Sequence, residues 1–327
     1  MIISRVISQE KGIYRIVSER GEKLAEVSGK FRYNALTVSE YPAVGDFVMA
    51  DWNDNGGNAV IHEVLTRKSC FMRKAAGGGR HEQIVATNVD IVFLCMSLNN
   101  DFNLRRMERY LSIAWESGSM PVIVLTKSDL CDDLEIKLAE VSAVAIGVDI
   151  VITNIVEEDG YKKILPYICE GKTIAFIGSS GVGKSTLINR LLGENKLDTN
   201  GLRNDDKGRH TTTHRELLVL PNGCAVIDTP GMRELGMWDS QDGIERTFAD
   251  IEELTAKCRF NDCSHIKEPG CAILKAIEDG QLSIERWQSY RKLKAENSYM
   301  EDSESYLAAK KKKFKEIAQY NKSNKKR

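Results

Sequence analysis

The sequence predicts a multidomain α/β protein with a small N-terminal β-barrel and a helical C-terminal part. Residues 1–72 contain short β segments separated by turn residues, which is typical of a barrel or a sandwich. From about residue 88, apolar β-rich runs alternate with amphipathic helical patterns, as in a mostly parallel sheet covered on both faces. From about residue 245, helical patterns surround a Cys/His cluster. We therefore expect three domains, at residues 1–72, 73–240 and 241–327.

The N-terminal β segments lie at residues 12–18, 23–29, 45–52 and 58–65. A five-stranded barrel of the oligonucleotide/oligosaccharide-binding (OB) type fits this length. From the pattern alone, a barrel that only packs against another domain fits equally well. The segment that follows, 74–83, has three consecutive Gly residues and no apolar periodicity, so we expect a linker there.

The middle region alternates strand and helix patterns. Helical patterns occupy residues 104–116 and 134–145. The apolar runs expected to form strands are 90–96, 121–126, 149–153, 173–178, 216–220 and 224–229.

Composition excludes several classes of protein. Of the 327 residues, 42% are hydrophobic and 28% charged, as in ordinary soluble globular proteins. No run reaches the roughly 18 apolar residues of a membrane helix, and the N-terminus lacks the apolar stretch of a signal peptide. We therefore expect a cytoplasmic protein, without a membrane partner, whose eight Cys residues are reduced or metal-bound.

Charge is distributed unevenly along the chain. Residues 310–327 carry nine Lys/Arg and one Glu, a net charge of +8, so the remaining residues sum to −9 within a total of −1. A basic tail on an acidic body favours a polyanionic partner such as nucleic acid, although such tails are also found as solvated ends.

The strongest signal is the Gly-rich segment GSSGVGKST, which matches the pattern G-x-x-x-x-G-K-[ST]. It follows a predicted strand and precedes a predicted helix, the context in which backbone N–H groups wrap phosphate oxygens. We expect Lys184 to reach the β- and γ-phosphates of a nucleotide and the Ser185 hydroxyl to bind Mg²⁺. The predicted phosphate-binding residues are Gly178, Ser179, Ser180, Gly181, Val182, Gly183, Lys184, Ser185 and Thr186.

Two later segments extend this site. A DTPG motif closes the predicted strand 224–229, which places Asp228 beside the metal and the Gly231 amide near the γ-phosphate. Before it lies RHTTTH, residues 209–214, in which one of three Thr residues is expected to bind Mg²⁺ and sense the γ-phosphate. Our candidate for that role is Thr212.

A base-reading motif lies upstream, where LTKSDL resembles the N-K-x-D element of GTPases. The Asp129 carboxylate can accept hydrogen bonds from N1–H and the 2-amino group of guanine, so it would select GTP over ATP. Lys127 would lay its aliphatic stem against the base. Thr126 stands where Asn is usual, which removes an amide that ties this loop to the phosphate loop. The predicted guanine-binding residues are Thr126, Lys127, Ser128 and Asp129, with Thr153 and Asn154 in a second loop.

The order of these motifs is circularly permuted. In an ordinary GTPase the phosphate loop comes first, whereas here the guanine-reading motif precedes it. We therefore predict a circularly permuted P-loop GTPase core that builds the same site in space. The chain leaves this core just after the segment that responds to the γ-phosphate.

A metal-binding pattern follows the core. Cys258, Cys263, His265 and Cys271 form C-x4-C-x-H-x5-C, and the other five Cys residues are scattered. Three thiolates and one imidazole satisfy a tetrahedral Zn²⁺ and leave no open position. We expect one structural zinc and no catalytic role for it.

Together these features resemble the small ribosomal subunit-dependent, circularly permuted GTPase family known as RsgA or YjeQ. The matching stretches lie between residue 88 and about residue 280, and they are NVDIVFLC, DFNLRRMERYL, TKSD, GSSGVGKSTLIN, GRHTTTHREL, DTPGMREL and CRFNDCSHIKEPGCA. The resemblance implies a GTPase that binds the 30S subunit late in its maturation and is stimulated by it. It also implies that the barrel and the zinc domain contact rRNA.

The same resemblance bears on catalysis. Met232 stands where Ras-like enzymes place the Gln that orients water. His210 then becomes the candidate to position the attacking water, acting with Lys184; the alternative is that His210 only packs or binds RNA. With no such Gln and no evident arginine finger, we expect slow intrinsic turnover and a need for an activator.

Two other functions stay open at this point. One is a GTP-dependent RNA-binding switch whose nucleotide occupancy, rather than hydrolysis, matters. The other is an ATP-using enzyme with a permuted core, which Asp129 disfavours. The expected ligands and partners are GTP or GDP with Mg²⁺, one Zn²⁺, and the 30S subunit with its rRNA, bound by a monomer.

Overall fold

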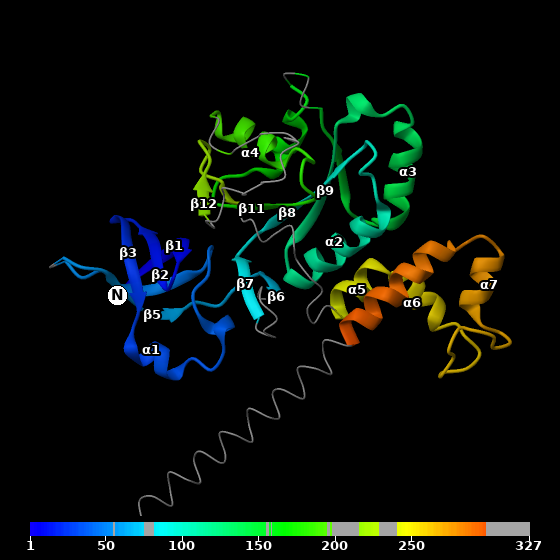
Figure 1. Ribbon diagram of the computed structural model, residues 1–327, viewed down its shortest axis with the longest axis horizontal. Helices are drawn as coiled ribbons and strands as arrows, with labels where there is room; N and C mark the ends of the chain where they lie inside the picture. Colours follow the sequence, from blue (N-terminus) through cyan, green and yellow to red (C-terminus); the bar gives the residue numbers. More distant parts are fainter. Residues whose placement is uncertain are drawn as a thin grey trace, which may run out of the picture. The chain divides into compact units, whose positions relative to one another are not determined.

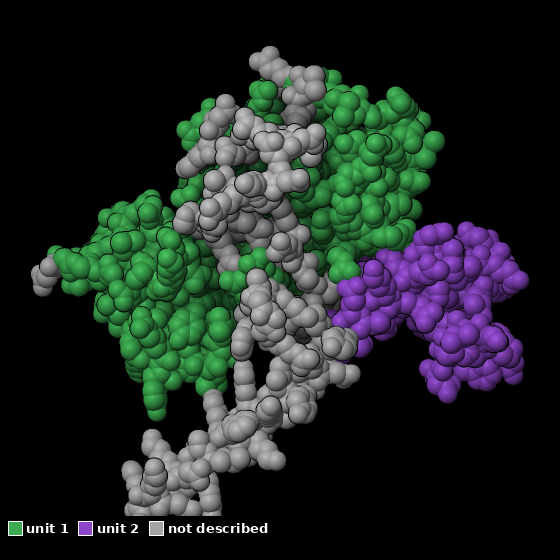
Figure 2. Space-filling view, viewed as in Figure 1, with its two compact units in different colours: residues 1–236 green, residues 237–327 purple. Residues whose placement is uncertain are grey.

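The computed structural model describes residues 1–54, 56–74, 82–154, 157, 159–194, 197, 216–228 and 241–298. The chain divides into two compact units, residues 1–236 and 237–327, coloured green and purple in Figure 2. The first unit contains both the predicted barrel and the predicted core. Among the described helices, none combines the length and the apolar character needed to span a bilayer.

The N-terminal barrel is closed by strand pairing in the order β1-β2-β3-β5-β4, with β4 returning to β1 (Figure 1, blue). β3 and β5 run parallel, and the other pairs are antiparallel. Alternate side chains such as Val6, Ile16 and Val48 point inward and are fully buried. This confirms the OB-like barrel, and β1 adds a strand outside the four predicted segments. The strands are β1 (Ile2–Glu10), β2 (Ile13–Ser18), β3 (Gly21–Val27), β4 (Phe47–Asp51) and β5 (Ala59–Val64).

A short helical segment connects β3 to β4. Helix α1 (Gly29–Asn34) begins where the Ser28 hydroxyl accepts the Phe31 N–H, and a 3-10 turn, η1 (Val38–Glu40), follows it. Because a hydroxyl satisfies one of the open N–H groups, Ser28 fixes the start of the helix.

A hairpin follows the barrel, made of β6 (Cys70–Lys74) and β7 (Glu82–Thr87). Its register pairs Phe71 with Ala86 and Lys74 with Glu82. The predicted linker at 74–83 is therefore too long at both ends, because Lys74 belongs to β6 and residues 82–83 belong to β7. Backbone pairing between the two strands includes these polar residues, which show no apolar periodicity. Residues 75–81 lie outside the described part of the chain.

The core is a mostly parallel sheet in the order β10-β9-β8-β11-β13-β12. Only β12 runs antiparallel within it. The six apolar runs predicted from sequence form these strands. They are β8 (Ile91–Ser97), β9 (Met120–Thr126), β10 (Asp149–Ile152), β11 (Thr173–Ile177), β12 (Glu216–Val219) and β13 (Ala225–Asp228).

Helices cover both faces of this sheet. On one face, Phe93 and Phe176 pack with Leu187 and Ile188 of α4 (Lys184–Leu192) in one buried cluster. On the other, α2 (Leu104–Ser117) contacts β8, β9 and α3 (Leu134–Val144). Two 3-10 segments, η2 (Ser128–Leu130) and η3 (Lys162–Tyr167), complete the connections. The predicted helices 104–116 and 134–145 are thus confirmed.

The barrel and the core are joined within the first unit by backbone and side-chain contacts. Ser8 of β1 pairs with Glu216 of β12, and an Arg5 guanidinium nitrogen lies 2.6 Å from the Thr173 hydroxyl. Gly45 has a φ of +98°, and a Cβ there would lie 2.2 Å from the Thr87 carbonyl oxygen. Only glycine permits this close approach of the two backbones.

The second unit is helical. Its named helices are α5 (Gln241–Thr247), α6 (Ala249–Thr255) and α7 (Ala272–Glu278), and residues 284–298 form a further helix. Phe248, Ile251 and Ile273 are fully buried between them. The Arg286 guanidinium donates to both carboxylate oxygens of Asp250, at 2.7 and 3.0 Å.

Candidate nucleotide site and metal centre

The predicted nucleotide motifs meet at one edge of the sheet. Ser97 pairs with Thr126, Leu125 with Ile152, and Leu94 with Ile177, so β8, β9, β10 and β11 end side by side. The loops that follow these strands therefore emerge together. In open parallel sheets the carboxyl ends of the strands are where ligands bind.

The Gly-rich loop leaves β11 and enters α4 directly. A Cβ on Gly178 would lie 2.5 Å from the Cys95 carbonyl oxygen, which explains glycine at that position. Gly181 and Gly183 adopt φ values of +73° and +103°, a region that favours glycine. The chain thus presents backbone N–H groups at the start of a helix, where an anion is stabilised.

Lys184 is folded over this loop. Its ammonium donates to the carbonyl oxygens of Gly178 and Ser179, both at 2.6 Å, and the side chain is buried. The lysine is therefore held at the loop, where its charge can pair with a bound phosphate.

Two neighbouring segments brace the loop. The Thr126 hydroxyl at the end of β9 donates to the Val182 carbonyl oxygen at 2.7 Å. In the segment after β8, which neighbours β11, the Asp101 carboxylate accepts the Ser179 hydroxyl, and Arg106 of α2 donates to both Asp101 oxygens at 2.8 and 2.9 Å. The sequence predicts that this connection between the two loops is missing, because Thr126 stands where Asn is usual. The prediction is wrong, since the Thr126 hydroxyl makes the connection.

The predicted guanine-reading loop, which begins at Thr126, turns sharply after β9. Lys127 has a φ of +58°, and the Asp129 carboxylate is exposed on η2. The second loop is attached to it, since the Thr153 N–H donates to the Leu125 carbonyl at 2.8 Å. Ser128 and Thr153 also approach one another, with the Ser128 hydroxyl 3.5 Å from the Thr153 carbonyl oxygen.

Part of the predicted site is not described. His210, Thr212 and Gly231 lie outside the described residues, as does Met232. Asp228 is the last residue of β13, at the same edge of the sheet as the Gly-rich loop. The roles assigned to these residues remain predictions.

Asp101 and Arg106 were not predicted as site residues. The contact between Ser179 and Asp101 joins positions 78 residues apart, a separation that no local pattern reveals. The sequence does contain one local feature in this segment: Asn103 is a residue type that favours helix starts, and its side chain caps α2 by accepting the Arg106 N–H. Such a cap fixes where α2 starts, but not which loop lies beside it.

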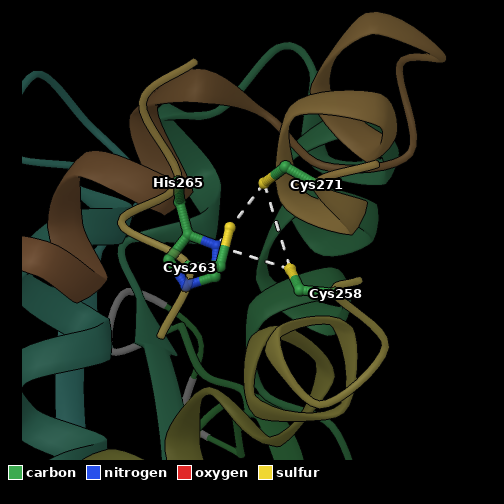
Figure 3. A group of neighbouring side chains, drawn as sticks. All are labelled: Cys258, Cys263, His265 and Cys271. Atoms are coloured by element: carbon green, nitrogen blue, oxygen red, sulfur yellow. Dashed lines mark hydrogen bonds between the residues drawn. The ribbon is translucent and has the colours of Figure 1, made fainter. Parts of the chain in front are cut away.

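In the second unit, the four predicted metal ligands come together. Figure 3 shows the side chains of Cys258, Cys263, His265 and Cys271 converging. Their ligand atoms all lie within 4.8 Å of one another. His265 Nδ1 lies 3.5 Å from the sulfurs of Cys258 and Cys271, which are 4.0 Å apart. A tetrahedral zinc ion with these ligands requires S···S and S···N separations of about 3.8 and 3.5 Å. The donor set therefore fits one structural Zn²⁺.

Surrounding groups hold these ligands in place. The Ala272 N–H donates to the Cys258 sulfur at 3.3 Å, and the His265 ring packs edge-on against Trp287 at 5.5 Å. Glu268 accepts hydrogen bonds from Ser264 and from the backbone of the residues before it. The Ser264 hydroxyl, then the N–H groups of Lys267 and Ile266, lower the pKa of Glu268 to about 2. The ionised carboxylate thus orders the loop that carries His265.

Comparison with known proteins agrees with this architecture. A family model described as RsgA GTPase matches residues 64–238, more than half of the chain. A small ribosomal subunit biogenesis GTPase, RsgA 2 of Lactiplantibacillus plantarum, is 50% identical over 91% of this chain and 84% of its own length. RsgA 1 of Oceanobacillus iheyensis is 44% identical over 99% of this chain and 93% of its own length.

Solved structures show the same fold. YjeQ from Thermotoga maritima superposes with a TM-score of 0.64 and 29% identity, covering 89% of this chain and 96% of that one. YloQ, titled a circularly permuted GTPase, gives 0.62 and 26%, covering 93% and 96%. The permuted motif order predicted from sequence is therefore confirmed, and GTP is favoured over the ATP alternative. With the family model, the relatives and the folded site in agreement, the chain belongs to the RsgA family of circularly permuted GTPases.

Proposed function

We propose that this chain binds the 30S ribosomal subunit, assists its late maturation, and hydrolyses GTP to GDP and phosphate with stimulation by that subunit. The observation that carries the proposal is the convergence of the guanine-reading loop and the Gly-rich loop at one edge of the permuted core. Its relatives are named small ribosomal subunit biogenesis GTPases. Those names favour hydrolysis over a switch in which nucleotide occupancy alone matters.

In the proposed site, the exposed Asp129 carboxylate reads the guanine edge and Lys127 covers the base. Thr153 and Asn154 form the opposite base-contacting loop. The backbone of residues 178–186 and the Lys184 ammonium bind the phosphates. The hydrogen bonds that hold the Lys184 ammonium at the carbonyl oxygens of Gly178 and Ser179 support this role. The charge that develops on the transferred phosphoryl group would be stabilised by groups already in place.

Hydrolysis proceeds in this proposal by in-line attack of water. Ser185 is the second residue of α4 and would hold Mg²⁺ with Thr212 and Asp228. That ion would supply charge neutralisation at the β- and γ-phosphates. His210 would position the water, since Met232 cannot do so with an amide.

The barrel, the zinc domain and the basic tail are proposed to contact rRNA. On the barrel, Tyr33 is 86% exposed on α1 beside Lys30 and Arg32, a combination of aromatic and basic groups that suits single-stranded RNA. Residues 310–327 would add phosphate contacts. A role on ribosomal subunits places the protein in the cytoplasm, and we propose that it acts as a monomer.

The test is GTP turnover with and without purified 30S subunits, with 50S subunits as the control. We expect strong stimulation by 30S alone and a basal kcat below about 1 s⁻¹. Equal turnover with and without 30S would refute the ribosomal role. A His210→Ala variant should bind GTP normally and lose the stimulated rate; unchanged stimulated turnover would remove His210 from catalysis.

A further inference from the structure

A side-chain network that begins in the segment between β8 and α2 holds the Gly-rich loop, residues 178–186, at Ser179. Ser179, the second residue of the loop, donates its hydroxyl to Asp101, while its carbonyl oxygen accepts the Lys184 ammonium at 2.6 Å. Ser179 is thus held through both its side chain and its backbone. Both contacts act on the residue at which the chain turns from β11 into the loop.

Asp101 is itself fixed by the segment between β8 and α2. Its N–H donates to the Asn99 side-chain oxygen at 3.1 Å, and that oxygen also accepts the Ser97 hydroxyl at 2.8 Å. Arg106, in the first turn of α2, donates to both Asp101 oxygens at 2.8 and 2.9 Å. The carboxylate therefore has a position set by the end of β8 and the start of α2.

The hydrogen bonds to Asp101 favour its ionised form, which accepts hydrogen bonds through both oxygens. Partial burial opposes ionisation, but hydrogen bonds from Ser179 and Arg106 outweigh it and lower the pKa of Asp101. An unpaired carboxylate beside a phosphate loop would repel phosphate. One Arg106 guanidinium nitrogen contacts both carboxylate oxygens and offsets that charge, and Asp101 Oδ2 also accepts the Ser179 hydroxyl.

We propose that Asp101 is a positioning residue for the phosphate loop: held by Arg106, it fixes Ser179 and so preorganises the loop for nucleotide phosphates. It acts through Ser179 and does not touch the nucleotide. The proposal rests on the assignment of residues 178–186 to phosphate binding. A loop that is already ordered loses less entropy when the ligand binds, so removing Asp101 weakens affinity and speeds release of GDP.

The experiment measures the affinity and dissociation rate of fluorescently labelled GDP for the full chain. Asp101→Ala and Ser179→Ala are each expected to weaken binding about tenfold, the scale of a lost hydrogen bond to a charged group. The double variant should bind no more weakly than either single variant, because both changes break one contact. Asp101→Asn keeps an acceptor oxygen and should bind more tightly than Asp101→Ala.

A matched control is Asp54→Ala, which removes an exposed carboxylate paired with Arg20 on the barrel and should leave GDP affinity unchanged. Thermal unfolding without nucleotide is measured for every variant. Unchanged GDP binding in Asp101→Ala overturns the proposal, as do additive losses in the double variant or affinity losses that simply follow lowered melting temperatures. Lys184→Ala distinguishes failure of the Asp101 proposal from failure of the phosphate-binding assignment on which it rests. Retained GDP binding in Lys184→Ala refutes the assignment of residues 178–186 to phosphate binding.

Discussion

The Thr126 hydroxyl lies 2.7 Å from the Val182 carbonyl oxygen, and this hydrogen bond connects the predicted guanine-reading loop to the Gly-rich loop, residues 178–186. Both residues are about 1% exposed. A buried acceptor that loses its donor retains the cost of its desolvation. The shorter threonine side chain therefore makes the connection usually made by an asparagine amide, and the two halves of the permuted site are braced together.

Thr126→Val tests this connection, because it replaces the hydroxyl by a methyl group of similar size. We expect the free energy of unfolding to fall by about 1–2 kcal/mol and GDP affinity to fall severalfold. Urea unfolding and titration with labelled GDP measure the two effects. Thr126→Ser keeps the donor and is the control; a Thr126→Ser variant as weak as Thr126→Val would show that packing, not the hydroxyl, matters.

Nucleotide selectivity is expected to depend on Asp129, which is exposed in the middle of η2. Asp129→Ala should weaken GDP binding by at least about tenfold and leave the much weaker ADP binding unchanged, because adenine lacks the donors that the carboxylate accepts. The measured quantity is the ratio of the GDP and ADP dissociation constants. The control is Asp132→Ala, which removes another exposed carboxylate three residues away. An unchanged ratio in Asp129→Ala would place the guanine reader elsewhere.

The sequence predicts the strands of the core, and the clustering of Cys258, Cys263, His265 and Cys271, for a physical reason. Binding phosphate with backbone groups and binding a tetrahedral metal each require particular residue types at fixed local spacings, and residues 178–186 and 258–271 carry such spacings. Continuous apolar runs such as 90–96 identify strands buried on both faces. Each of these signals is contained in a short stretch of chain, so one sequence suffices to find it.

The parts that escape prediction depend on distant pairing. Asp101 and Ser179 become neighbours only because β8 and β11 are adjacent in the sheet. The strands β6 and β7 extend into residues 74 and 82–83, which carry no apolar period, because backbone pairing rather than side-chain burial defines their ends. To predict where a strand ends, or which residue an acidic side chain contacts, one must know the order of strands in the sheet. The motifs alone do not specify that order.

Glu268 is expected to govern how well the Cys3His cluster retains metal. Its carboxylate accepts the Ile266 and Lys267 N–H groups at 2.9 and 3.0 Å, and so shapes the turn that carries His265. Glu268→Ala should weaken zinc affinity by about 10–100-fold, the usual effect of losing an outer support of a metal site. Zinc transfer to a coloured chelator measures this.

The control for that measurement is Glu253→Ala, an exposed acid on α6. Removal of zinc from the wild type should lower the melting temperature of the second unit, because the metal would hold together the segments that carry the four ligands. Equal zinc retention in Glu268→Ala and Glu253→Ala would show that the ligands need no help from this carboxylate.

Arg67 forms an ion pair with Asp46, which lies directly before the start of β4 in the barrel. Asp46 is fully buried and accepts two Arg67 hydrogen bonds at 2.8 Å, while Arg67 also donates to the carbonyl oxygens of Ser39 and Tyr41. Removing one partner leaves a buried charge without compensation. Arg67→Met should therefore lower the free energy of unfolding by roughly 3–5 kcal/mol.

Arg20 provides the matched comparison, since it pairs with Asp54 at 3.0 Å but both side chains are largely exposed. Arg20→Met should cost no more than about 1 kcal/mol, because water screens the pair. Urea unfolding of both variants measures the difference. Adding Asp46→Leu to Arg67→Met should restore part of the loss, because the uncompensated charge is then gone. If the double variant is no more stable than Arg67→Met, the Arg67 contacts to Ser39 and Tyr41, rather than the charge of Asp46, account for the cost.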